Sequence, residues 1–287
     1  MTVKLIEEFI VPILENEDDP LIWKNMAKIA VGPKVWKKYS PNDKPFNEWE
    51  EIMSEIITGD AFGVDRMDYL LRDSYHAGVP YGIFDHHRLI DTLKVLPKNY
   101  EGKDSQENVS LSLGMESGGL HSAEALLLAR YFMYKQVYFH PVRRIYNFHL
   151  QEFLKSKYGS EFPIKPSDFV KLTDVEVLTE IRKDLENPHA KVINERKHYR
   201  RLKIEGNSQD IKEKGDNIPK QIPEGKYYID IYDNSEKKNK AEFPVHRRDK
   251  KIVNGFTESQ VLRNIPSIDF GYIFVNLDCF NEAEKLI

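Results

Sequence analysis

Apolar residues recur at helical spacing through the first ninety positions, and glycine and proline separate one segment from the next. A recurrence of about 3.6 residues is typical of helices that bury one face. The pattern predicts four helices, at Met1–Leu14, Leu21–Val31, Trp49–Ile57 and Val64–Tyr75. Gly32, Gly59 and Gly78 follow the last three, where glycine is expected to end a helix.

After residue 91 the period changes to an alternation of apolar and polar residues. Thr92–Leu96 and Val109–Leu113 alternate in the way of strands, so we expect a hairpin there. Helical spacing returns over Leu120–Leu154, and Pro141 inside this stretch predicts a kink or a break because proline lacks the backbone N–H.

A domain boundary is expected near residue 165, because Phe162–Ser167 carries two prolines. We therefore expect a helical domain at 1–165 and an α+β lobe at 166–287, which makes the fold mainly α. The second part is predicted to contain helices at Asp168–Glu186 and Ala190–Arg200, a mobile charged insertion at Asn207–Pro223, and strands at Lys226–Tyr232, Glu242–His246 and Tyr272–Asn276.

The composition of the chain excludes several classes of protein. The 287 residues are 40% hydrophobic and 31% charged, and no run of about 18 apolar residues exists that could span a membrane. Met1–Leu14 lacks the basic and apolar regions of a secretory signal, and a single cysteine, Cys279, forbids an internal disulfide. We therefore expect a cytoplasmic protein. The net charge of −4 argues against a protein that coats nucleic acid.

Candidate chemistry first appears in Phe62–Val79. On a helix, Asp65, Tyr69 and Asp73 fall on one stripe because they are four residues apart, and Arg66 lies beside it. Such a stripe can bind a metal and phosphates side by side. The alternative is a solvated face with i,i+4 ion pairs such as Asp68–Arg72, each contributing about 0.2–0.5 kcal/mol.

A second stripe lies in Ala129–Arg144. Arg130, Tyr134 and Tyr138 are again four residues apart, so a guanidinium and two phenols can face a phosphate, a sugar or a base. The alternative is that the tyrosines pack against a neighbouring helix. His140, which precedes Pro141, is either a general acid or a histidine of the core.

The stretch VDRMDYLLRDS and the spacing R-x3-Y-x3-Y-x-H resemble the HD-domain deoxynucleoside triphosphate triphosphohydrolases. The resemblance implies the C-terminal portion of an HD-domain helical core and hydrolysis of dNTPs to deoxynucleoside and triphosphate. It implies that Arg66 and Arg130 contact the triphosphate and that Asp73 accepts from the sugar 3′-hydroxyl. The further substrate-lining residues that it implies are Tyr69, Tyr134, Tyr138 and His140.

The same resemblance implies a divalent metal ion (Mn, Mg, Fe, Ni or Zn), with Asp65 as its last ligand. The family's earlier ligands are a His and an adjacent His-Asp pair, yet the first histidine here is His76 and no His-Asp dipeptide occurs. We therefore expect an incomplete metal site, with no catalytic residue assigned, in a chain that begins just after the catalytic front half. His86 and His87 are predicted to start a helix rather than to replace these ligands.

Three hypotheses remain at this stage. The chain is a portion of a dNTP triphosphohydrolase, or a non-catalytic nucleotide-binding or oligomerisation module, or a protein that contacts single-stranded nucleic acid through Arg196–Lys203. For that basic segment, a solvated helix face without a ligand is favoured over a nucleic-acid contact. The resemblance implies a further alternative, that the segment binds an allosteric nucleotide. The resemblance also implies a homo-oligomer, a dimer or a tetramer.

Overall fold

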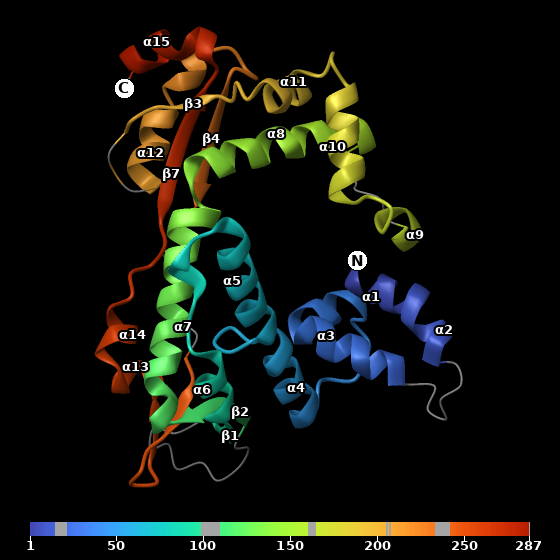
Figure 1. Cartoon of the computed structure of the whole chain (residues 1–287), viewed down its shortest axis with the longest axis vertical. Coiled ribbons are helices and arrows are strands. Elements are labelled where there is room, and N and C mark those ends of the chain that lie inside the picture. The colour runs from blue at the N-terminus through green and yellow to red at the C-terminus, as the bar shows by residue number, and fades with distance from the viewer. Residues whose placement is uncertain are drawn as a thin grey trace. The chain divides into compact units, whose positions relative to one another are not determined.

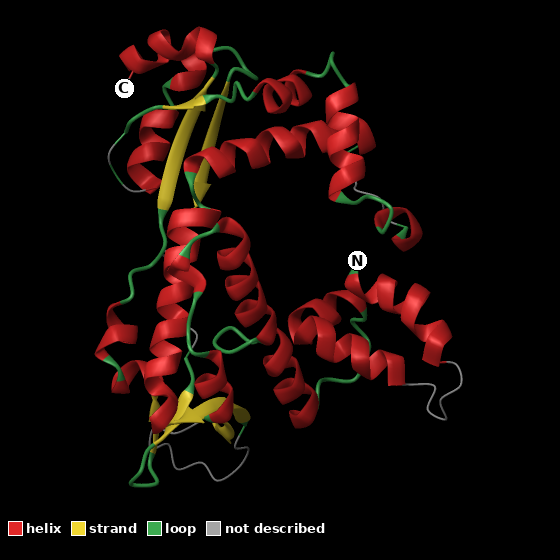
Figure 2. Ribbon diagram, in the orientation of Figure 1, coloured by secondary structure: helices red, strands yellow, loops and turns green. Residues whose placement is uncertain are grey.

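The structure is a computed structural model. It describes residues 1–14, 22–98, 110–159, 165–204, 206, 208–232 and 242–286. Most of these residues are helical and two small sheets complete the fold, so the expected class, a mainly α protein with a small α+β part, is confirmed (Figure 2). No described helix has both the length and the apolar character needed to cross a membrane.

The chain forms two compact units, and each is composed of two segments. Unit 1 comprises Met1–Met133 and Asn239–Pro266, and unit 2 comprises Tyr134–Lys238 and Ser267–Ile287. The boundary expected near residue 165 falls inside unit 2. Helices on both sides of that position share one buried cluster, made of Phe153, Ile181 and Ala190, which holds them in the same unit.

Unit 1 is a set of helices with one sheet (Figure 1). Its helices are α1 (Thr2–Leu5), α2 (Val11–Leu14), α3 (Ile22–Tyr39), α4 (Glu48–Thr58), α5 (Val64–Ala77), α6 (His86–Asp91), α7 (Leu120–Met133), α13 (Gly255–Glu258) and α14 (Gln260–Asn264). Its strands are β1 (Leu93–Pro97), β2 (Leu111–Glu116), β5 (Pro244–His246) and β6 (Ile252–Asn254), in the order β1-β2-β5-β6. The predicted hairpin is confirmed, because β1 and β2 pair antiparallel with Val95 opposite Leu113.

Local sequence explains where the helices of unit 1 begin and end. Asn47 caps α4 in a capping box with Glu50, and Gly78 ends α5 with a left-handed φ of 67°. Gly32 has a φ of 74° and interrupts α3 as expected, but a helix resumes at Pro33, which the apolar pattern did not predict. Proline suits the first position of a helix because its missing N–H has no partner there.

Unit 2 packs its helices around a three-stranded sheet. The helices are α8 (Pro141–Tyr158), α9 (Pro166–Phe169), α10 (Asp174–Lys183), α11 (Pro188–Glu195), α12 (Ser208–Gly215) and α15 (Phe280–Ala283). The strands β3 (Arg200–Arg201), β4 (Tyr227–Tyr232) and β7 (Phe270–Val275) are antiparallel in the order β3-β7-β4. The break predicted at Pro141 is confirmed, because α8 begins at that residue after a π-helical turn, Tyr134–Tyr138.

Three expectations for unit 2 were wrong. The single helix expected at Asp168–Glu186 is instead two helices, α9 and α10, with residues 170–173 outside both. The charged insertion was expected to be mobile, yet α12 lies within it, and Ile211 and Ile218 enter the core beneath β7. The basic segment Arg196–Lys203 was expected on a helix, but α11 ends at Glu195 and the segment runs into β3. Within the segment Arg200 and Arg201 form the strand, and the burial of Tyr199 and Leu202 shows that the segment is not a uniformly solvated face.

Candidate functional site

The predicted stripe on α5 exists, and the opposite face of the helix holds it in place. Met67, Leu70 and Ser74 are buried, which leaves the face with Asp65, Tyr69 and Asp73 outside the core. Asp65 stands in the first turn of α5, where a carboxylate is favoured by the positive end of the helix dipole. The stripe therefore follows from helical periodicity alone.

Ion pairs on the same helix show that the alternative interpretation also holds in part. Arg72 pairs with Asp68 one turn away, and its Nε lies 3.7 Å from Asp73 Oδ1. These side chains are largely exposed, so the pairs contribute little to stability. Both features therefore coexist on α5.

Two arginines, from α5 and α7, meet at the turn between α4 and α5. Arg66 donates from Nε to the Gly59 carbonyl at 2.9 Å and from Nη2 to Asp60 Oδ1 at 2.6 Å. Arg130 donates from Nη1 to the backbone carbonyl of Asp60 at 3.0 Å. The structure thus brings together two predicted residues that are far apart in sequence. The apolar pattern identified Gly59 as a helix end but gave no role to Asp60.

The remaining predicted residues, Tyr134, Tyr138 and His140, belong to unit 2. The two tyrosine rings meet edge to face with centroids 5.1 Å apart, and Tyr134 also contacts Phe139. His140 is exposed and directly precedes α8, so it is not a core histidine. These ring contacts lie within one short stretch of the chain and do not test packing against a neighbouring helix, so both interpretations of the tyrosines stay predictions.

A buried histidine pair in unit 2 was not found from the sequence. His149 of α8 is fully buried, its Nδ1 lies 3.0 Å from Nδ1 of His189, and its Nε2 has no hydrogen-bond partner. Burial, with a smaller contribution from the charge of His189, lowers the pKa of His149 to about 3. In the sequence, each of the two histidines is a single polar residue on the apolar face of its helix. The helical pattern therefore gives no other sign of this pair.

We expect this pair to make the protein acid-sensitive. Unfolded His149 takes up a proton near pH 6.5 while the folded form resists it down to about pH 3, so stability present above pH 6.5 is lost as the pH falls through this window. The loss is about 1.4 kcal/mol per pH unit for one histidine. Urea unfolding between pH 7.5 and 5 measures it. His149→Phe should flatten the dependence and the exposed control His76→Gln should not; equal slopes in wild type and His149→Phe would contradict the assignment.

The family resemblance implied a divalent metal ion with Asp65 as its last ligand, at a site that was expected to be incomplete. Within the ranges that the structure describes, no three His, Cys, Asp or Glu side chains lie where they could hold one metal ion. The described residues therefore do not fit a complete site, and no catalytic step is assigned to a metal here.

Known proteins resemble this chain in sequence. Residues 84–222 match the model of a family described as the HD associated region. An uncharacterized protein of Methanocaldococcus jannaschii is 40% identical over 96 residues, and one of Bacillus subtilis is 41% identical over 80 residues. These matches cover 33% and 28% of this chain but only 19% and 16% of the two relatives.

Solved structures resemble the whole described fold. A hypothetical protein from Aquifex aeolicus is 31% identical with a TM-score of 0.78, and the match covers 99% of this chain and 70% of that one. A phosphohydrolase from Bacteroides thetaiotaomicron has a TM-score of 0.59 at 19% identity, over 96% of this chain and 70% of that one. The second likeness shows a shared fold.

Proposed function

We propose that the chain belongs to the HD-domain family and that it forms the substrate-binding portion of a phosphohydrolase that converts dNTPs to deoxynucleoside and triphosphate. The observation that carries the proposal is the convergence of Arg66 and Arg130 on one turn. Guanidinium groups bind phosphate oxygens through paired, charge-assisted hydrogen bonds, and two at one place suit a polyphosphate better than a single charge.

The neighbouring residues of α5 supply the remaining polar groups of the proposed site. Tyr69 and Asp73 lie one and two turns beyond Asp65, on the same face. In the proposal Tyr69 borders the phosphates and Asp73 accepts from the sugar 3′-hydroxyl. These roles concern binding, and we assign no residue to the hydrolytic step.

A second candidate function is nucleotide binding without turnover. It is favoured by one observation, that the described side chains do not form a complete metal site. Release of inorganic triphosphate from each dNTP, with Mn²⁺ or Mg²⁺ added, separates the two functions when it is measured on this chain joined to a segment that supplies the family's His and His-Asp ligands. Binding with release supports the hydrolase, and binding without release supports the second candidate.

Arg130→Ala is expected to weaken dNTP binding about 10- to 100-fold, because a charge-assisted bond contributes about 1.5–3 kcal/mol. Calorimetric titration with dGTP and the other dNTPs measures the dissociation constant. The matched control is Arg248→Ala, which removes an exposed arginine between β5 and β6 and should leave affinity unchanged. Failure of the wild-type chain to bind any dNTP, or equal affinity in both variants, would reject the proposal.

A further inference from the structure

We propose that Asp60 is a positioning residue for the two arginines, a role that rests on the proposed function above. Its carboxylate accepts from Arg66 at 2.6 Å and its backbone carbonyl accepts from Arg130 at 3.0 Å. One residue therefore orients two guanidinium groups before a polyphosphate arrives.

The backbone that carries Asp60 is closely packed and hydrogen-bonded on both sides of this residue. A Cβ on Gly59 would lie 2.2 Å from the carbonyl oxygen of Glu55, and one on Gly63 would lie 2.6 Å from that of Gly59. The Gly63 amide donates to the Gly59 carbonyl at 3.0 Å, and the same carbonyl accepts from Arg66 Nε. A side chain at either position would collide with backbone atoms, so both glycines are required for the turn conformation that presents Asp60 to the two arginines.

The exposure of Asp60 makes it possible to measure its effect on the position of Arg66 apart from its effect on folding stability. The side chain of Asp60 is 72% exposed, whereas that of Arg66 is 18% exposed. An ion pair with one partner in water adds little to folding stability. The carboxylate can therefore be replaced without unfolding the unit, and the effect on a bound anion can be measured directly.

Orientation matters because arginine loses much rotamer freedom on binding. An arginine already fixed by a carboxylate loses less, and binding is tighter by that difference. Two guanidinium groups near each other also repel, and a carboxylate beside them reduces this repulsion. The carboxylate of Asp60 repels the phosphates, but it also keeps the two arginines in place. The second effect offsets the first.

The test is calorimetric titration of the wild-type chain, Asp60→Ala and Asp60→Asn with inorganic triphosphate. Asp60→Ala should weaken affinity about three- to tenfold, the range expected from freeing one long side chain. Arg130 binds the backbone, which this variant keeps, so the loss reports on Arg66. Asp60→Asn keeps an oxygen that can accept from Arg66 and should bind within about twofold of the wild type or tighter.

The controls distinguish failure of this inference from failure of the proposed function. Asp91→Ala removes an exposed carboxylate at the end of α6 and should leave affinity unchanged. If the wild-type chain binds neither triphosphate nor dNTPs, the proposed function fails and the inference with it. If the wild type binds, the inference alone is overturned by Asp60→Ala binding as tightly as or tighter than the wild type, or by Asp60→Asn failing to restore affinity.

Discussion

Replacement of Arg144 by methionine is expected to lower the free energy of unfolding by about 3–5 kcal/mol, because it leaves a buried carboxylate without its partner. Asp230 of β4 is 4% exposed and accepts two bonds from Arg144 of α8, each of 2.6 Å. Such a paired, bidentate contact also raises the pKa of Arg144 above its ordinary value through its hydrogen bonds to Asp230. The contact joins α8 to the sheet of unit 2.

Urea unfolding followed by circular dichroism measures this effect. Tryptophan emission does not report on it, because Trp23, Trp36 and Trp49 all lie in unit 1. The matched control is Arg143→Met, at the exposed neighbouring position, which should cost less than about 1 kcal/mol. Adding Asp230→Leu to Arg144→Met should recover part of the loss; equal stability of Arg144→Met and Arg143→Met would contradict the prediction.

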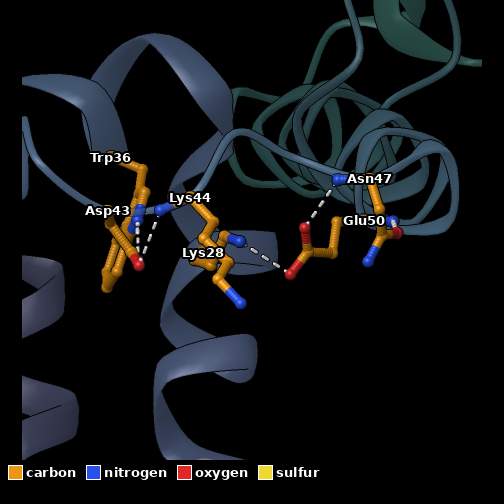
Figure 3. A network of polar contacts seen from close by, with 6 residues as sticks. All are labelled: Lys28, Trp36, Asp43, Lys44, Asn47 and Glu50. Atoms are coloured by element: carbon orange, nitrogen blue, oxygen red, sulfur yellow. Dashed lines mark hydrogen bonds and ion pairs between the residues drawn. The ribbon is translucent and has the colours of Figure 1, made fainter.

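Glu50→Ala is expected to destabilise unit 1 by about 3–5 kcal/mol, because it leaves a buried ammonium unpaired. The side chain of Lys28 is 6% exposed, and its Nζ donates to Glu50 Oε1 at 2.7 Å (Figure 3). Glu50 Oε2 also accepts from the Asn47 amide at 2.8 Å, so the same substitution removes half of the capping box of α4. The network joins α3 to α4, and beside it Trp36 donates to Asp43 at 2.9 Å.

Tryptophan emission during urea unfolding measures this prediction, since all three tryptophans belong to unit 1. Glu48→Ala is the matched control: it removes an exposed acid from the first turn of the same helix and should cost about 0.3–1 kcal/mol. Lys28→Met in the Glu50→Ala background removes the unpaired charge and should restore stability in part. A Glu50→Ala variant as stable as the control would show that Lys28 finds water or another partner.

Both pairs illustrate a limit of sequence-based prediction. Lys28 and Glu50 are 22 residues apart and Arg144 and Asp230 are 86 apart, so no local period connects them. A charged residue within an amphipathic helix is expected to be solvated, and only its partner in space explains its burial. The same holds for His149 and His189, which lie on separate helices of unit 2.

The sequence by itself determined the local structure around the candidate site. The apolar period, together with glycine and proline, acts over a few residues and was enough to predict several local features. These are the ends of α4 and α5, the hairpin of β1 and β2, the break at Pro141, and the common face of Asp65, Tyr69 and Asp73. Only the tertiary structure decided that Arg66 and Arg130 meet at Asp60, that Arg200 and Arg201 of the basic segment form a strand, and which helices share a unit. These depend on contacts between distant segments, and the periodicity of one segment carries information about which face is buried but not about what buries it.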